Sequence, residues 1–354
     1  MGNLSKILKV SREKKNLSGA EAAKLLKIDA SLLNRFEKGN RLPTKQQLAI
    51  ISKIYKLELR ELQIEWLSEK IYKEIDGQDF ALEALRVAEE KVSYNKPNYK
   101  DEAIIKQIDK LKKQLDAVRP LPIEQIKNLE EYFRIQYTYD SNRIEGNTLT
   151  LQETALIVNH GITISGKSVN EHLEAINHSE AVELILDLVQ NKTNLTEYIL
   201  KQIHSLILRG INKHYAGKYR NVNVMISGST HKPPEPFLLD KLMEEYFLFY
   251  EANKNTMHPV LLAAEMHERL VTIHPFVDGN GRTSRLIMNL ILMQHGFPIT
   301  HISGDKENRL SYYKSLEAVR VENDKNKFYD FVSNATLNSL TEFLSIVIPK
   351  KDKT

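Results

Sequence analysis

The stretch TIHPFVDGNGRTSRLIM, residues 272–288, contains two of the chain's 14 glycines on either side of one asparagine. Before it, apolar residues at helical spacing predict a helix from Pro259 to Ile273. After it, a second helix is predicted from Gly281 to a stop at Gly296, and it is apolar over most of its circumference, as is typical of a central, buried helix. The loop between the two helices is therefore expected to be held rigidly at both ends.

This loop and the turn after it carry residue types that suit an anionic ligand. Gly279 and Gly281 allow the backbone to approach a ligand with its N–H groups turned inward, at the positive end of a helix dipole. Arg282 and Arg285 are three residues apart, so both reach the same side of the first helical turn, where each can fork phosphate oxygens. Asp278 offers a hard oxygen ligand for Mg²⁺, the usual companion of a di- or triphosphate.

Two further residues supply groups for a reaction. Asn280 can donate a hydrogen bond to charge that develops on a phosphoryl oxygen. His274 is the group here whose pKa suits the removal of a proton from a hydroxyl near neutral pH. Each residue alone has an ordinary structural use as a cap or a turn, but their combination within residues 274–285 predicts phosphoryl or nucleotidyl transfer.

The same residues resemble the signature of the Fic family, His-Pro-Phe-x-Asp/Glu-Gly-Asn-Gly-Arg-x-x-Arg, which is matched at every defined position from His274 to Arg285. The resemblance spans about residues 120–335. It implies a helical core with one hairpin, and the transfer of AMP from Mg-ATP to a hydroxyl side chain of a target protein. Transfer of phosphate, as in the Doc-like branch of the family, is less favoured because that branch typically has lysine where Gly281 stands.

The resemblance also implies a role for each site residue. It makes His274, Asn280 and Arg282 catalytic, Gly279, Gly281, Arg282 and Arg285 part of the ATP-binding site, and Asp278 the Mg²⁺ ligand. Tyr312 and Tyr313 in RLSYYKSLEA fit the adenine-pocket position, although the following VRVENDKNKF differs from the family's usual Ala-Asn-Glu-Gly-Asp.

The segment IEQIKNLEEYFRIQYTYDSNRIEGNTLT predicts a helix over residues 123–146 that ends at Gly146. Ser141 and Glu145 lie on one face of this helix. A glutamate at a helix C-terminus opposes the helix dipole, which suggests that Glu145 has a positive partner elsewhere. The segment SNRIEG also matches the family's inhibitory motif, Ser/Thr-x-x-x-Glu-Gly/Asn, which implies that Glu145 pairs with Arg285 and holds the γ-phosphate of ATP out of its productive position.

The segment around residues 222–229 changes period. Val222, Val224 and Ile226 alternate with polar residues and Met225, and the alternation ends at Gly228, which predicts a short β-hairpin. A plain connection between helices is the alternative from the pattern alone. The family resemblance implies that this hairpin is the target-binding flap, with Val224, Met225 and Ile226 holding an extended peptide by strand addition.

The N-terminal part differs in charge from the rest of the chain. Residues 1–66 contain 14 Lys/Arg against 7 Asp/Glu, whereas the remainder has 36 against 39. A basic module of this kind indicates an anionic polymer as partner. Ser18 and Glu21 form a capping box for one helix, and Asp29 caps a second that stops at Gly39.

These two short helices resemble the repressor-type helix-turn-helix family, often called XRE, over about residues 4–64. The resemblance implies that the helix from Asp29 to Lys38 enters the major groove of DNA. Two departures are Gly19, where a DNA-contacting glutamine is common, and Lys27, in a turn that usually has glycine. Because a left-handed lysine costs about 1 kcal/mol or more, an altered turn and a module that docks protein are alternatives. The DNA-contacting residues that we predict are Ala30, Ser31, Asn34, Arg35 and Lys38.

The sequence therefore predicts an all-α protein with a single small hairpin. We expect a helix-turn-helix domain at 1–66, a helical connector at 67–120, a Fic domain at 121–335 and a C-terminal helix and tail at 336–354. The absence of cysteine excludes disulfides, and no apolar run is long enough to span a membrane, so we expect a cytoplasmic protein.

The function that we predict is that of an autoinhibited adenylyltransferase with ATP and Mg²⁺ as its cofactors, and with a target protein and DNA as partners. A homodimer is expected because repressor-type domains usually read two half-sites. Two other functions stay open. The first is a transcriptional regulator whose Fic core senses ATP or modifies itself, and the second is an enzyme that removes AMP.

Overall fold

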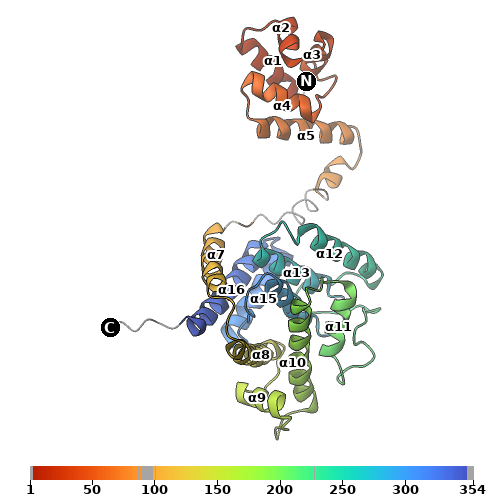
Figure 1. The fold of residues 1–354 in the computed structure, drawn as a ribbon. Coiled ribbons are helices and arrows are strands. Elements are labelled where there is room, and N and C mark those ends of the chain that lie inside the picture. Colours follow the sequence, from red (N-terminus) through yellow and green to blue (C-terminus); the bar gives the residue numbers. More distant parts are fainter. Residues whose placement is uncertain (1–2, 87, 89–98, 100, 227, 349–354) are drawn as a thin grey trace, which may run out of the picture. The chain divides into compact units, whose positions relative to one another are not determined.

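The computed structural model describes residues 3–86, 88, 99, 101–226 and 228–348. Contacts divide the chain into two compact units, Met1–Tyr94 and Asn95–Thr354. Within the described residues of both units, all regular elements are helices (Figure 1). The prediction of an all-α fold is thus confirmed. In the described part of the chain, no helix is both long and apolar enough to cross a bilayer.

The first unit is a small helical domain with its own core. Its core is formed by apolar side chains that include Leu8, Phe36 and Leu48. The predicted capping box is present, since the Ser18 backbone N–H donates to the Glu21 carboxylate and the Glu21 N–H donates to the Ser18 hydroxyl. The helices are α1 (Asn3–Lys14), α2 (Gly19–Leu26), α3 (Ala30–Glu37), α4 (Lys45–Tyr55) and α5 (Leu59–Ile75).

The turn between α2 and α3 keeps the geometry expected of a helix-turn-helix. Lys27 adopts the left-handed conformation, with φ 56° and ψ 42°, and its N–H closes the end of α2. The side chain of Asp29 then caps α3 by accepting from the Ser31 N–H at 2.7 Å. The turn is therefore not altered by the lysine. The five residues predicted to contact DNA all lie on or just after α3, and all are exposed.

The second unit contains the remaining helices. They are α7 (Glu102–Ala117), α8 (Ile123–Ile144), α9 (Leu151–His160), α10 (Val169–Gln190), α11 (Glu197–Ile207), the short 3₁₀ helix η1 (Pro236–Leu238), α12 (Leu239–Asn253), α13 (Pro259–Ile273), α14 (Asn280–Gln294), α15 (Lys306–Val321) and α16 (Asn326–Val347). Helix α7 packs against α16 and buries Ile108 and Leu115 in the core of this unit. Residues 87, 89–98 and 100 of the predicted connector lie outside the described residues, as does the tail after residue 348.

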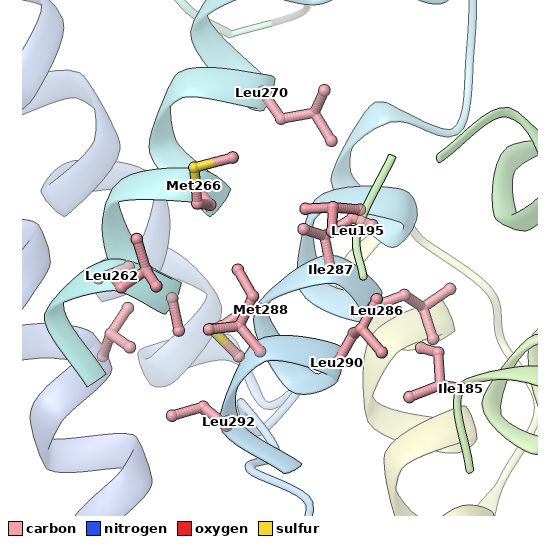
Figure 2. Close-up of a cluster of buried hydrophobic side chains, with 14 of the residues drawn as sticks. Ile185, Leu195, Leu262, Met266, Leu270, Leu286, Ile287, Met288, Leu290 and Leu292 are labelled. Carbon is pink, nitrogen blue, oxygen red and sulfur yellow. The ribbon is translucent and has the colours of Figure 1, made fainter. Parts of the chain in front are cut away.

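Helices α13 and α14 form the centre of the second unit. Helix α14 packs against α13, α10, α11 and α8. Figure 2 shows Leu286, Ile287 and Leu290 of α14 surrounded by apolar side chains of neighbouring segments, among them Met266 and Ile185. Burying a side chain of this size stabilises the fold by about 1.5–3 kcal/mol. The loop between the two central helices is therefore attached at both ends to the best-packed part of the unit.

The predicted β-hairpin is wrong for the described residues of its segment. Residues 222–226 and 228–235 form no strand, and Ser227 lies outside the described residues. The alternating pattern before Gly228 is typical of an extended strand. The residues after Gly228, which would form the second strand of the hairpin, are followed by Pro233, Pro234 and Pro236. Proline has no backbone N–H to donate to a ladder, so three prolines disfavour the pairing of this arm as a strand. The segment is instead an irregular loop.

Candidate active site

The loop from His274 to Gly279 delivers an open helix N-terminus to the site. Gly279 is the N-cap of α14, with φ 77°, and no side chain caps this helix. Thr283 is the first residue of α14 whose N–H donates back to Gly279. Among the described residues, no acceptor is bonded to the N–H groups of Asn280, Gly281 and Arg282. They form the kind of site that binds an anion.

Asn280 braces this loop from inside. Its side-chain amide donates to the Phe276 carbonyl at 2.9 Å, and its side-chain oxygen accepts from the Phe276 N–H at 3.0 Å. The residue is only 2% exposed. The structure thus places the Asn280 carboxamide within the loop, where it sets the shape of the backbone around the helix N-terminus.

His274 ends α13 and presents one ring nitrogen. Its backbone is left-handed, with φ 51° and ψ 57°. Nδ1 lies 3.2 Å from the Val271 carbonyl. Because a carbonyl can only accept, Nδ1 carries the proton and Nε2 keeps its lone pair. Burial lowers the pKa of His274 to about 4. The imidazole is therefore neutral at physiological pH, with its lone pair on Nε2.

Arg285 is fully buried, and its donors are directed at α8. Nε donates to the Ser141 hydroxyl at 3.0 Å, and Nη2 donates to the Ser141 carbonyl at 2.8 Å and to the Glu145 carboxylate at 2.7 Å. Burial acts to lower the pKa of Arg285, but the Glu145 carboxylate more than offsets it, so the net pKa is raised. Arg285 thus stays charged in the core because α8 supplies an anion and a hydroxyl.

Glu145 is the C-cap of α8, and Gly146 follows it with φ 102°. A carboxylate at this end opposes the helix dipole by about 0.3–1 kcal/mol, and the ion pair with Arg285 at 2.7 Å outweighs that cost. Burial acts to raise the pKa of Glu145, but Arg285 and Arg282 outweigh it, and the pKa is lowered. The side chain keeps 33% exposure, so the ion pair faces the opening of the site.

Gly281 provides the space in which the Glu145 carboxylate sits. A Cβ at residue 281 would lie 2.4 Å from Glu145 Oε1, far inside contact distance. The carboxylate is therefore seated on the first turn of α14, beside the unbonded backbone N–H groups.

Arg282 has a different environment from Arg285. Its Nη1 donates to Glu174 of α10 at 3.0 Å, and its Nη2 lies 3.6 Å from Asp278. Its Nε is buried and has no acceptor among the described residues. A buried donor without an acceptor costs about 1–3 kcal/mol.

Asp278 is the most exposed residue of the motif, with its side chain 61% exposed. One of its oxygens accepts from the Gly279 N–H at 2.5 Å. Within the described residues, no three His, Asp or Glu side chains come together to hold a metal ion. A single carboxylate does fit Mg²⁺, which commonly takes one or two protein carboxylates and completes its shell with phosphate oxygens and water.

The two tyrosines predicted for an adenine pocket have different surroundings. Tyr312 is 2% exposed and lies behind Arg285, with its hydroxyl 3.0 Å from His267 Nε2 and 3.4 Å from Arg285 Nη1. Tyr313 is 41% exposed, and its hydroxyl donates to the Ile144 carbonyl at 3.0 Å. Only Tyr313 presents its ring to solvent, whereas Tyr312 supports the arginine.

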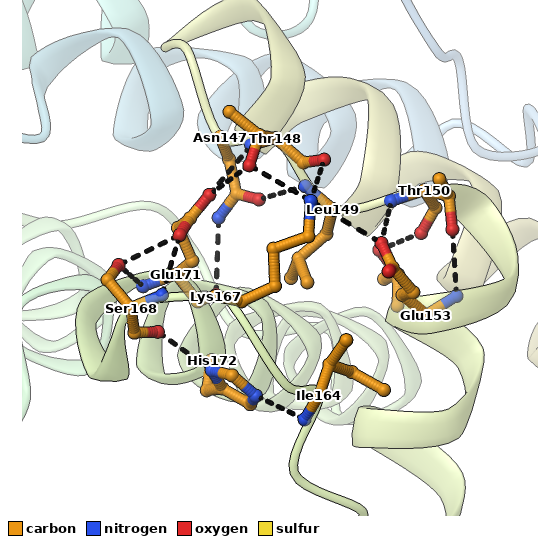
Figure 3. Close-up of polar contacts among 11 residues, drawn as sticks. Asn147, Thr148, Leu149, Thr150, Glu153, Ile164, Lys167, Ser168, Glu171 and His172 are labelled. Carbon is orange, nitrogen blue, oxygen red and sulfur yellow. Dashed lines mark hydrogen bonds and ion pairs between the residues drawn. The ribbon is translucent and has the colours of Figure 1, made fainter.

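The turn after Glu145 is tied to α10 by a polar network (Figure 3). The Thr148 N–H and hydroxyl both donate to Glu171, whose pKa is lowered to about 2 by donors from Thr148 and Ser168. Asn147 donates to the Glu174 carboxylate at 2.9 Å. Since Glu174 also binds Arg282, the network connects the turn after Glu145 to the motif.

Sequence reasoning did not identify Glu174, or His204 of α11. His204 stacks on Phe276 with ring centroids 3.6 Å apart, accepts from the Gly217 N–H at Nδ1, and so donates from Nε2 to the Asp278 carbonyl at 2.9 Å. It is completely buried, and burial lowers its pKa to about 4. A histidine in an apolar helix stripe carries no local signal of this role.

The three residues predicted to bind the target, Val224, Met225 and Ile226, follow Arg220 closely in the chain. In the described part of the chain they belong to no strand. Met225 is 93% exposed. A cavity of about 1020 Å³ lies between α15 and α16, and it is lined by Thr230 and Glu317 among others. None of the residues from His274 to Arg285 lines that cavity.

The fold and the site define an all-α protein in which an uncapped helix N-terminus follows a neutral histidine. Residues 194–292 match the Fic/DOC family, and residues 8–62 match a helix-turn-helix family. The chain thus contains a Fic/DOC-family domain and, N-terminal to it, an XRE-type helix-turn-helix domain.

Curated relatives support the same assignment. The protein adenylyltransferase Fic of Culex quinquefasciatus is 36% identical over 246 residues, which are 69% of this chain and 48% of the relative. The enzyme of the same name from Nematostella vectensis is 34% identical over 247 residues, 69% of this chain and 56% of the relative. The chain thus spans about half the length of the curated relatives it matches.

Solved structures agree in fold. A Fic-domain signalling protein from Bacteroides thetaiotaomicron aligns with a TM-score of 0.62 and 29% identity, over 68% of this chain and 97% of that one. Fic-1 from C. elegans aligns with a TM-score of 0.62 and 23% identity, over 97% of this chain and 98% of that one, which shows a shared fold.

We predict that the His274 imidazole of the unliganded protein stays neutral until the pH falls to about 4, with the proton on Nδ1, because burial disfavours its charged form. Long-range ¹H–¹⁵N NMR spectra recorded during a pH titration measure both properties. The spectrum of His274→Gln identifies the signal by its disappearance. Titration near the ordinary histidine pKa of about 6.5 would contradict the prediction.

Proposed function

We propose that this protein is an autoinhibited adenylyltransferase, which transfers AMP from Mg-ATP to a hydroxyl side chain of a target protein or of itself. The observation that carries the proposal is the Glu145 carboxylate at the N-terminus of α14, paired with Arg285 at 2.7 Å inside the complete motif. The relatives named adenylyltransferases support the choice of reaction.

In this reaction the target hydroxyl oxygen bonds to the α-phosphorus of ATP, and the bond from that phosphorus to the oxygen bridging to the β-phosphate breaks. Pyrophosphate leaves, and the hydroxyl proton goes to His274 Nε2. The unbonded N–H groups of Asn280, Gly281 and Arg282 would bind phosphate oxygens. Asp278 would hold Mg²⁺, which neutralises phosphate charge when bound.

Autoinhibition follows from charge and space. While Glu145 is in place, the Nε and Nη2 groups of Arg285 are used by Ser141 and Glu145 and are not free for a phosphate. A phosphate charge about 4 Å from the carboxylate would be repelled by roughly 4 kcal/mol at an effective dielectric constant near 20. That penalty is enough to disfavour a productive triphosphate by about a thousandfold.

We also propose that the first unit binds DNA through α3. The exposed Asn34 and Arg35 are side chains that read base edges, and Lys38 extends the basic surface.

The alternative of a regulator that senses ATP at its Fic core uses the same two units. Removal of AMP is a further alternative, because the ionised Glu145 carboxylate could orient a water molecule at the site.

AMP transfer predicts which label is retained. In the presence of Mg²⁺ and a protein extract as source of hydroxyl targets, we expect label from α-labelled ATP, but not from γ-labelled ATP, to stay on protein, with release of pyrophosphate. His274→Ala should abolish the labelling, since it removes the base. Retention of the γ label without the α label would show phosphate transfer instead.

Loss of the inhibitory carboxylate predicts activation. Glu145→Gly should raise the labelling rate at least about tenfold, because it frees Arg285 and the α14 N-terminus. The matched control is Glu131→Gly, the same substitution at an exposed position of the same helix. It should leave the rate near that of the wild type. Equal labelling by the wild type and Glu145→Gly would remove Glu145 from the mechanism.

DNA binding predicts a salt-dependent complex. In mobility-shift assays with duplex DNA from upstream of the chain's own coding sequence, affinity should fall steeply between low and moderate salt, since cations displace counterions from phosphates. Arg35→Ala should weaken the complex, whereas Lys241→Ala, at an exposed lysine of α12, should not. Absence of any complex at low salt would favour a protein-docking role for this unit.

A further inference from the structure

Arg220 is a buried cation held by carbonyl groups. It is 3% exposed, and in the described part of the chain no carboxylate lies within ion-pair distance of it. Burial lowers its pKa. A buried guanidinium without a carboxylate is expensive unless its donors are satisfied. The hydrogen-bond acceptors of the Arg220 guanidinium identify the segments that it connects.

Two of these acceptors close a loop. Nη1 donates to the Val222 carbonyl at 3.0 Å, and Nη2 donates to the Pro234 carbonyl at 2.5 Å. One planar guanidinium therefore joins the two ends of the segment 222–234, which we call the flap loop. Compact loops closed at their ends in this way are frequently functional.

The other contacts of Arg220 reach the catalytic motif. Nε donates to the His274 carbonyl at 2.8 Å, and the Arg220 backbone N–H donates to the Pro275 carbonyl at 2.9 Å. His274 has a left-handed backbone, with φ 51°. Such a conformation costs about 1–3 kcal/mol and persists only where its surroundings hold it. Arg220 is one of the groups that hold it.

The far part of the flap loop is attached separately. The Ser229 and Thr230 hydroxyls donate to the Glu317 carboxylate at 2.6 and 2.7 Å, and His231 Nε2 lies 3.0 Å from the Thr272 carbonyl. These contacts leave the exposed Met225 between two anchors. Arg220 is the anchor at the base of the loop, and it is the one shared with His274.

We propose that Arg220 is a positioning residue that couples the flap loop to His274. It fixes the position of the surface that receives the target hydroxyl relative to the base that deprotonates this hydroxyl. The catalytic part of this inference rests on the proposed adenylyltransferase function. The coupling itself is a property of the fold and can be measured without the reaction.

The test uses Arg220→Lys in the full chain, with Glu145→Gly present for the activity measurements. Lysine keeps the charge, but its single ammonium cannot span carbonyls on three separate segments as a guanidinium does. Arg209→Lys is the matched control, at an arginine with a 52% exposed side chain that pairs with Glu180. Thermal unfolding and circular dichroism establish that each variant is folded.

The first readout does not depend on activity. Thermolysin should cleave Arg220→Lys between residues 222 and 226 at least about tenfold faster than the wild type, and the NMR signal of His274 should move in the same variant. Arg209→Lys should behave as the wild type in both measurements. Unchanged cleavage and an unchanged His274 signal would overturn the proposal, as would global unfolding of both Arg220→Lys and Arg220→Gln, which would make Arg220 a general core residue.

The second readout separates positioning from folding. In the Glu145→Gly background, Arg220→Lys should lower the labelling rate at least about tenfold, while the affinity for ATP stays within about twofold, since the α14 N-terminus is untouched. An equal loss of ATP affinity would contradict a positioning role. If Glu145→Gly itself transfers no AMP, the proposed function fails, and the coupling is decided by the cleavage and NMR measurements alone.

Discussion

One buried charge connects the central helix of the second unit to α8. Arg285 projects from the central helix α14 into the core, where an uncompensated guanidinium would cost several kcal/mol. The C-terminal turn of α8 supplies the compensation, through the hydroxyl and carbonyl of Ser141 and the carboxylate of Glu145. These contacts join the C-terminal turn of α8 to the motif, and in the function that we propose they also inhibit the site.

The shape of the motif loop is held by a hydrogen-bonded side chain of the loop itself and by side chains from segments far away in the chain. Asn280 ties the loop to itself, His204 fixes the Asp278 carbonyl and stacks on Phe276, and Arg220 holds the carbonyl of His274. Each of these groups is buried, and each uses a hydrogen bond to the backbone rather than to another motif side chain. The shape of the motif loop is thus held at backbone positions, by the side chains of Asn280, His204 of α11 and Arg220.

The two arginines of the motif also differ in their surroundings. Arg285 is satisfied by α8 and backed by Tyr312, whereas Arg282 keeps a buried Nε without an acceptor among the described residues and pairs with Glu174 near the opening. The network from Glu171 through Asn147 to Glu174 connects the turn after Glu145 to Arg282. Movement of that turn would therefore change the surroundings of both arginines.

Much of this protein could be predicted from local sequence patterns. The helical periods around Leu262 and Leu290, the capping box at Ser18 and the spacing from His274 to Arg285 are properties of neighbouring residues, so they are visible without a fold. The spacing also indicated that Glu145, set against its own helix dipole, needs a positive partner. The hairpin prediction was wrong because the alternating pattern covers only the first arm, before Gly228. Whether a second strand pairs with that arm depends on the residues after Gly228, which include three prolines.

The sequence by itself thus determined the fold class, the motif and the basic helix-turn-helix domain, because propensity, capping and charge spacing act over a few residues. The pairing of Glu145 with Arg285, which the family resemblance implied, is present at 2.7 Å. Only the tertiary structure decided which other groups meet across long separations, namely Glu174 with Arg282 and Arg220 with His274. The physical reason is that a buried charge takes whatever partner the packing of helices brings within about 3 Å. That packing is a property of the whole core and of no single segment.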